Sequence, residues 1–176
     1  VGFMMIEISQ IQRLSIFLGH PTYSLSAALF TILLSSGIGS YLSSSDRSVL
    51  NNTTKLKLVI LLAVLALFGF FTPSIINAFS SSTTGIRILI SVIILFPMGL
   101  FLGMAFPIGM KLASEGYPEI TPWLWGINGV MSVMATVLSI IVSLKYGISI
   151  SYWAGAVCYL LAFLTYLSIS RNLNSK

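Results

Sequence analysis

The sequence predicts an all-α fold, a polytopic integral membrane bundle of about six transmembrane helices in a single domain over residues 1–176. Of the 176 residues, 56% are hydrophobic and only 7% are charged, whereas a soluble domain carries about 25% charged residues. The apolar residues also form continuous runs, and a transmembrane barrel would instead alternate polar and apolar residues over about ten positions. We therefore expect helices in a lipid bilayer.

Six runs approach the length of about 20 apolar residues that a bilayer core requires. They cover residues 1–19, 22–44, 57–79, 86–114, 122–145 and 149–170. The first is interrupted by polar residues. We expect Pro73 to bend or end the third run, and Pro97 and Pro107 to break the fourth. A broken helix can line an ion site with its backbone carbonyls, but neighbouring helices can equally stabilise a kink.

The basic residues predict the orientation, because Lys and Arg gather in cytoplasmic loops. If the first loop faces outward, six of the nine basic residues are cytoplasmic, namely Arg47, Lys55, Lys57, Lys111, Arg171 and Lys176. The other three are Arg13, Arg87 and Lys145. This distribution predicts a cytoplasmic C terminus. It also explains the net charge of +5 without nucleic-acid binding, which would require a dense basic face.

Aromatic residues near the ends of the spans predict two interfacial belts. One belt would contain Tyr117, Trp123 and Trp125, and the other would contain Tyr146, Tyr152 and Trp153.

Small and polar residues recur at helical spacing and predict helix–helix packing seams. The fifth span carries Asn128, Ser132, Thr136, Ser139 and Ser143, and the second carries Ser24, Ala28, Thr31, Ser35 and Gly39. The fourth contains the pair Gly99-x-x-x-Gly103. Such seams let helix backbones approach closely. A transport path is the alternative interpretation.

The candidate site lies in the first span, where Glu7 is the only acid within a predicted helix. Glu7, Gln10 and Arg13 are three residues apart and lie along one side of that helix. Arg13 could pair with Glu7 through Gln10, or each could find a partner on another helix, such as Asn128. A buried polar network that fixes helix register and a proton- or substrate-handling site both fit the pattern. A misplaced span boundary is the third alternative.

Gln12 and His20 complete the candidate set. His20 precedes Pro21, which favours a turn into the second span. A metal or haem site would need further His or Cys ligands, and the only other such residue is Cys158, far away in sequence. A single cysteine also excludes an internal disulfide. The sequence contains no Gly-rich phosphate loop and no nucleophile–base–acid set, so we predict no cofactor and no catalysis.

Four motifs together resemble the C-terminal transmembrane region of bacterial membrane-bound spermidine synthase-like proteins. They are E-I-x-x-I-Q-R from Glu7, L-G-H-P-x-Y-S from Leu18, G-M-x-F-P-x-G from Gly103 and P-W-x-W-G-x-N-G from Pro122. The resemblance covers most of the chain in the same order. The matching positions are Glu7, Gln12, Arg13, His20, Pro21, Pro107, Trp123, Trp125, Asn128 and Gly129.

The resemblance implies a bacterial cytoplasmic (inner) membrane protein whose relatives join membrane helices to a Rossmann-like aminopropyltransferase domain. That domain would bind decarboxylated S-adenosylmethionine and a polyamine. This chain has neither the strand–glycine loop–helix unit nor an acidic cluster for a polyamine. Because the sequence opens with VGFMMIEI, without an initiator Met or a signal peptide, we expect it to be part of a longer chain.

Three functions are therefore open. The first is a non-catalytic membrane module that acts as anchor, scaffold or accessory subunit, with other membrane subunits or a fused or associated soluble domain as partners. The second is a small-molecule or polyamine transporter that uses Glu7 and the broken fourth helix. The third is the membrane part of an enzyme whose catalytic domain lies outside this sequence.

Overall fold

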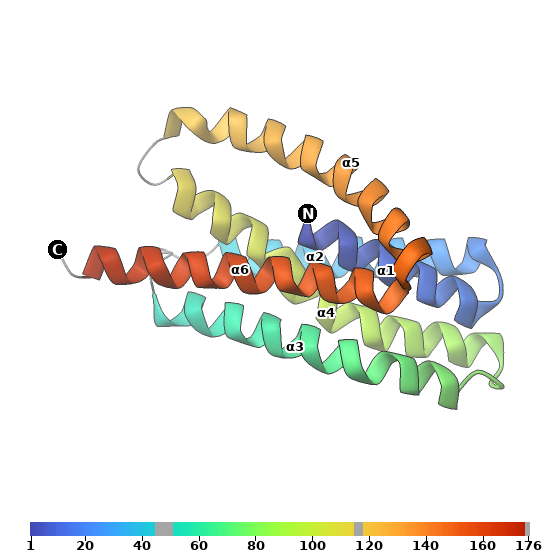
Figure 1. Ribbon diagram of the computed structural model, residues 1–176. Coiled ribbons are helices and arrows are strands. Elements are labelled where there is room, and N and C mark those ends of the chain that lie inside the picture. The colour runs from blue at the N-terminus through green and yellow to red at the C-terminus, as the bar shows by residue number, and fades with distance from the viewer. Residues whose placement is uncertain (45–50, 115–117, 175–176) are drawn as a thin grey trace.

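The computed structural model describes residues 1–44, 51–114 and 118–174, and these residues form helices with no strand among them (Figure 1). The helices are α1 (Gly2–Leu18), α2 (Pro21–Ser44), α3 (Asn52–Ala78), α4 (Thr84–Ser114), α5 (Thr121–Tyr146) and α6 (Ile148–Asn174). A short 3-10 helix, η1 (Pro118–Ile120), precedes α5. The prediction of an all-α helix bundle is confirmed. Five of the helices, α2 to α6, are long and apolar enough to cross a membrane.

α1 differs from the other helices because it is short and central. Its 17 residues span about 26 Å. It packs against α2, α4, α5 and α6, and the N terminus lies part of the way along the bundle (Figure 1). The C terminus lies at one end of the bundle, which we call the C-terminal end; the α1–α2, α3–α4 and α5–α6 connections lie at the opposite end. α1 therefore places its polar residues among other helices instead of facing lipid.

Apolar side chains on several sides of α1 form the middle of the core. Ile6, Leu14, Phe17 and Leu18 join one buried cluster with residues of α2, α3, α4 and α6. Packing inside hydrocarbon depends on close van der Waals contact and on interhelical hydrogen bonds, because lipid is as apolar as the side chains. The polar residues of α1 supply interhelical hydrogen bonds.

α2 and α4 approach each other through the predicted seams. All five small or polar residues of the α2 seam are buried. A Cβ atom added at Gly99 would collide with the Ser35 hydroxyl, and one added at Gly103 would collide with the Ser36 carbonyl oxygen. The interpretation of these residues as a packing seam is confirmed. The α5 seam packs only in its second half, where Ser139 and Ser143 are buried.

Pro73 does not end its helix, and Pro97 and Pro107 do not break theirs, so the expected interruption of the fourth span is wrong. α3 continues through Pro73 to Ala78, and α4 continues through both Pro97 and Pro107 to Ser114. A helix interrupted within hydrocarbon would leave several backbone groups without partners, each at a cost of several kcal/mol. A proline inside a continuous helix removes only one backbone hydrogen bond. The transporter hypothesis therefore loses the broken fourth helix on which it partly rested.

The corner between α1 and α2 follows from its local sequence. Gly19 adopts the left-handed conformation (φ 73°), and its N–H donates to the Ser15 carbonyl oxygen at 3.2 Å. This is the usual glycine ending of a helix. Pro21 is the first residue of α2. Arg87 of α4 donates from Nη1 to the Phe17 carbonyl oxygen at 2.9 Å, so a cation caps the C-terminal end of α1.

Candidate functional site

The structure buries the centre of the predicted site and leaves its edges exposed. Gln10 is fully buried, and Glu7 and Arg13 are only 5% and 7% exposed. Gln12 is half-buried, while His20 and Asn128 are exposed. Glu7, Gln10 and Arg13 therefore lie inside the bundle, and Asn128 on α5 is not their partner.

Arg13 contacts α6 instead of an acid. Its Nη2 donates to the Ser149 hydroxyl at 3.2 Å, and its guanidinium lies 5.0 Å from the centre of the Tyr152 ring. A cation over an aromatic face is attracted by the ring quadrupole, more strongly where water is excluded. Within the described residues, Arg13 forms no ion pair with Glu7. The pairing of these two residues through Gln10, one of the arrangements that the sequence suggested, does not occur.

Tyr152 joins four helices at one point. The side chain is fully buried, and its hydroxyl donates to the Leu65 carbonyl oxygen of α3 at 2.8 Å. The same hydroxyl lies 3.8 Å from the sulfur of Met98 on α4. With Arg13 of α1 over its ring, Tyr152 of α6 ties α1, α3 and α4 together. The prediction that Tyr152 belongs to an interfacial aromatic belt is wrong.

Gln10 also contacts Met98 of α4. Its Nε2 donates to the Met98 sulfur at 3.6 Å, which is a weak acceptor. Gln10 Oε1, Gln12 Oε1 and Arg13 Nη1 are shielded from solvent and have no hydrogen-bond partner in the described part of the chain. Buried polar atoms usually find partners, and the described residues leave these three atoms of α1 without one.

The Glu7 carboxylate likewise has no partner among the residues that the structure describes. It forms no hydrogen bond and no ion pair with any residue in ranges 1–44, 51–114 and 118–174. A charged carboxylate within the membrane is costly unless it is paired, protonated or hydrated. Among the residues of this network, Glu7 is therefore the best candidate for a proton- or substrate-handling role.

A cluster of hydroxyl groups fastens α5 to α6 and α1. The Ser139 and Ser151 hydroxyls are 2.8 Å apart, and Ser139 also lies 3.4 Å from the Met5 carbonyl oxygen. Tight polar contacts of this kind are typical of helix interfaces in membranes. The cluster fixes the second half of α5 to the core.

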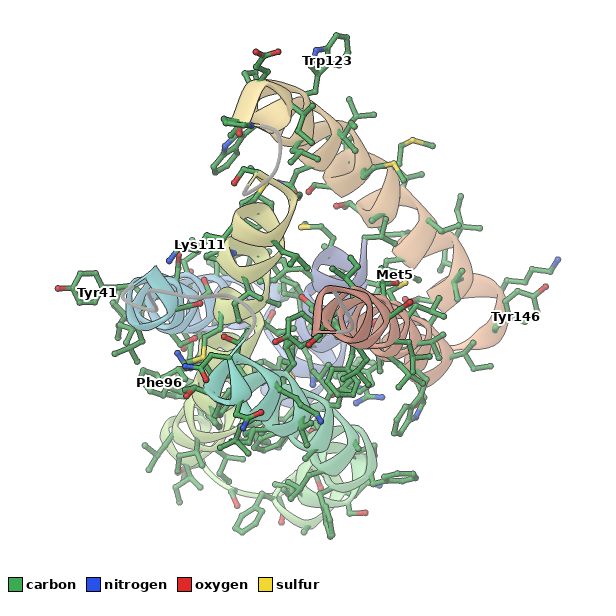
Figure 2. All side chains as sticks on the ribbon, turned by 90° about the vertical axis from the view of Figure 1, so that its left-hand side faces the viewer. Met5, Tyr41, Phe96, Lys111, Trp123 and Tyr146 are labelled. Atoms are coloured by element: carbon green, nitrogen blue, oxygen red, sulfur yellow. The ribbon has the colours of Figure 1, made fainter. Side chains whose placement is uncertain are left out.

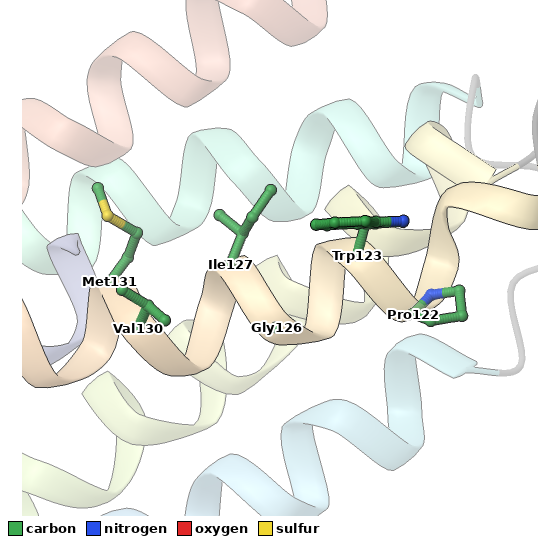
Figure 3. Close-up of a pocket in the computed structure, with 6 residues that line it drawn as sticks. All are labelled: Pro122, Trp123, Gly126, Ile127, Val130 and Met131. Carbon is green, nitrogen blue, oxygen red and sulfur yellow. The ribbon is translucent and has the colours of Figure 1, made fainter.

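The first half of α5 stands away from the bundle (Figure 2). Trp123 is 76% exposed and points outward in this view along the bundle axis. A hollow of about 560 Å³ on this half is lined only by α5 residues: Pro122, Trp123, Gly126, Ile127, Val130 and Met131 (Figure 3). The main ring contact back to the bundle is Trp125 against Phe106 of α4, with centroids 5.1 Å apart.

A larger space, which we call the lateral groove, lies between α5 and the rest of the bundle. Its volume is about 990 Å³. It is lined by residues 1–4 and by parts of α2 to α6, including Asn128 on α5 and Cys158 on α6. Neither Glu7, Gln10, Gln12 nor Arg13 lines it. The structure thus separates the polar network from the lateral groove.

Sequence reasoning missed Tyr152 and Ser149 as the partners of Arg13. A signal was present, because Ser151, Tyr152, Gly155 and Ala156 recur at helical spacing and are all buried on α6. The structure groups no three His, Cys, Asp or Glu side chains as a metal site within the residues it describes.

The fold and its surface define the class of this molecule as a helical integral membrane protein. Five helices have the length and composition of membrane spans, and large apolar side chains cover their outer faces. No protein-family model, no curated protein and no solved structure matches the chain. Function must therefore be argued from the residues themselves.

Proposed function

We propose that the chain is a non-catalytic membrane module that acts as an anchor, scaffold or accessory subunit of a larger membrane assembly. One observation carries the proposal: two of the buried polar side chains of α1, those of Gln10 and Arg13, contact other helices of the same chain. Arg13 contacts Ser149 and Tyr152, and Gln10 contacts Met98. A transport site would instead turn these side chains toward a cavity that a solute can enter, and the lateral groove does not reach them.

The surface of α5 supports the same proposal. Its buried residues, Ala135, Ser139 and Ser143, all lie in its second half, so the first half has lateral room for a partner. We further propose, from the resemblance to spermidine synthase-like membrane regions, that one partner is a soluble aminopropyltransferase-like domain and that the assembly belongs to a bacterial inner membrane. Reaction chemistry would then belong to that domain, and the membrane module would hold it at the bilayer.

The scaffold role is tested by the composition of the native assembly. We would extract the tagged chain from its own membranes in a mild detergent and measure the protein mass by native mass spectrometry. We expect a complex heavier than the 19.1 kDa of this sequence, with a stoichiometric protein partner or a covalently attached domain. A particle that contains only this 19.1 kDa chain would contradict the scaffold role.

Transport is a second candidate because of Glu7, a buried carboxylate without a partner in the described residues. We would reconstitute the chain in liposomes and measure the uptake of radiolabelled spermidine. The test compares Glu7→Gln with Glu119→Gln, since Glu119 is exposed on η1. Saturable uptake that is lost only in Glu7→Gln, at equal protein content, would favour transport over the scaffold role. We expect no uptake above that of protein-free liposomes.

The C-terminal end of the bundle is proposed to face the cytoplasm. Lys55, Lys57 and Lys111 lie near this end, at the start of α3 and in the last turn of α4, as the positive-inside rule favours. A fluorescent protein fused after Lys176 should fluoresce, and alkaline phosphatase at the same position should be inactive. The reverse result would place the C terminus outside.

A further inference from the structure

The Glu7 side chain faces the boundary between α2 and α4. Successive residues of a helix are turned by about 100°, so two contacts of α1 define this direction. Gln10, three residues after Glu7, contacts Met98 of α4. The Ser15 hydroxyl, eight residues after Glu7, lies 2.8 Å from the Ser24 hydroxyl of α2. The side of Glu7 lies between these two sides, and Glu7 is only 5% exposed there.

No neighbour within α1 balances a charge on Glu7. Side chains on a helix surface meet when they are three or four residues apart. For Glu7 these neighbours are uncharged: Phe3, Met4, Gln10 and Ile11. Arg13, the cation of this helix, points about 120° away from Glu7 around the helix axis. It contacts Ser149 and Tyr152 of α6 instead.

The two helices at this boundary bring no charge to Glu7 either. Along α2, no residue between Tyr23 and Tyr41 has an ionisable side chain, and both tyrosines are exposed. Along α4, no residue between Arg87 and Lys111 has one, and these two cations lie in the first and last turns of the helix. The boundary that Glu7 faces is therefore built from neutral side chains.

α5 and α6 also pack against α1, and their ionisable side chains face elsewhere. Those of α5 are its last two residues, Lys145 and Tyr146, which are exposed. Those of α6 are Tyr152, Cys158, Tyr159, Tyr166 and Arg171. Tyr152 faces Arg13, and Cys158 and Tyr159 lie beside Gly2, on a side of α1 about 140° from that of Glu7. The last two lie farther along α6, toward the C-terminal end.

We propose that the folded bundle holds Glu7 as a neutral, protonated carboxyl group, so that Glu7 is a proton-binding site of this protein. An isolated carboxylate in an apolar interior is far less favourable than a neutral carboxyl group. The charge balance identifies the ligand, because neither α1 nor the helices packed on it offer Glu7 a cation among the described residues. The same part of the chain gathers no three His, Cys, Asp or Glu side chains for a metal ion. The proton is taken from solvent when α1 packs into the bundle.

Infrared spectroscopy distinguishes the proposed form from an ionised, hydrated Glu7, because protonated carboxyl groups and carboxylates absorb at separate stretching frequencies. The sequence contains three glutamates, so Glu7 is the only one left in a Glu115→Gln/Glu119→Gln protein. Cell-free synthesis with glutamate labelled with ¹³C at the side-chain carboxyl carbon then assigns the shifted band to Glu7. We expect this band at the frequency of a protonated carboxyl group near neutral pH in lipid vesicles. A labelled band at the carboxylate frequency would overturn the proposal.

The bound proton also makes stability depend on pH. In the unfolded protein Glu7 meets solvent and ionises above about pH 4.3, as an ordinary glutamate does. Above that pH the folded protein holds one more proton than the unfolded protein. The equilibrium constant for unfolding therefore rises by up to tenfold per pH unit. The stability that this proton contributes is fully present below about pH 4.3 and is lost as the pH rises.

Unfolding in mixed micelles between about pH 6 and pH 8 tests this dependence. We expect the unfolding constant of the parent to rise by about tenfold per pH unit relative to that of Glu7→Gln, because glutamine is neutral throughout. Glu119→Gln, which removes an exposed acid, should keep the slope of the parent. Equal slopes in the parent and Glu7→Gln would overturn the proposal. The infrared measurement decides the question even where Glu7→Gln does not fold, since it leaves Glu7 intact. Neither measurement involves a partner protein, so a negative result here does not bear on the scaffold role.

Discussion

Replacing Arg13 and Tyr152 singly and together should reveal a coupling free energy between α1 and α6. The guanidinium lies 5.0 Å from the centre of the Tyr152 ring, and both side chains are buried. A cation–π contact is worth about 0.5–1 kcal/mol at an exposed site and about 2 kcal/mol when desolvated. Because Arg13 is only 7% exposed, we expect a coupling of about 1–2 kcal/mol.

The choice of substitution separates the ring from the hydroxyl. Tyr152→Phe keeps the ring and removes the bond to the Leu65 carbonyl oxygen, which should cost about 0.6–1.5 kcal/mol. Tyr152→Leu removes the ring and the hydroxyl and also leaves a smaller side chain in the core. It should therefore cost about 2–4 kcal/mol. Arg13→Met keeps an unbranched apolar stem and removes the charged guanidinium.

The assay is reversible unfolding in mixed micelles as the fraction of sodium dodecyl sulfate rises. Helix content and tryptophan emission report the transition, and Trp153 lies 5.9 Å from the Tyr152 ring between centroids. The cycle of Arg13→Met with Tyr152→Leu should show the coupling, whereas the cycle with Tyr152→Phe should be additive. A coupling of less than about 0.3 kcal/mol in the Leu cycle, which is within ordinary additivity, would falsify the proposed contact.

Three further perturbations test the packing. Gly103→Ala should destabilise the protein by about 1–3 kcal/mol because α2 and α4 must separate, whereas Gly109→Ala, with open space around its Cβ, should not destabilise it. Ser139→Ala should cost about 1 kcal/mol, and Ser132→Ala, whose hydroxyl bonds only within α5, should cost less. Gly19→Ala should cost about 1–2 kcal/mol because φ is 73°. Each is measured as a shift in the same micelle unfolding transition.

Each of these predictions has a result that contradicts it. If alanine at Gly103 and alanine at Gly109 have equal effects on stability, α2 and α4 do not touch at Gly103. A Ser139→Ala protein as stable as the parent would show that the serine pair with Ser151 does not fasten α5. A neutral Gly19→Ala would exclude the left-handed corner before α2.

Composition and periodicity were sufficient to predict the helices and one of the seams. Ser24, Ala28, Thr31, Ser35 and Gly39 all face inward, because a helix with small residues on one side gains most by packing that side. The partner of each side chain was harder to predict. Periodicity gives the side of a helix on which a residue lies, but not which neighbouring helix faces that side.

Arg13 and Asn128 illustrate this limit. Arg13 finds Ser149, 136 residues away in the chain, and no local pattern encodes that pairing. Asn128 belongs to a regular seam, but helix tilt is set by packing against neighbouring helices, and α5 leans away from the bundle there (Figure 2). Tyr152 could be mistaken for an interfacial residue because Tyr is common at membrane surfaces, whereas its hydroxyl is satisfied deep inside by the Leu65 carbonyl oxygen.

The central position of α1 has a consequence for synthesis of the protein on the ribosome. α1 is translated before any other helix described here, but Ser149, the hydrogen-bond partner of Arg13, is translated 136 residues later. Translation proceeds at about 5–20 residues per second. The Arg13 guanidinium therefore lacks its partner on α6 for on the order of 7–27 s. A charge without its partners is held at the membrane interface or beside the translocon until they arrive. Arg13 of α1 therefore completes its contacts only after α6 has been made, and an arrest of translation before α6 should leave α1 accessible to protease.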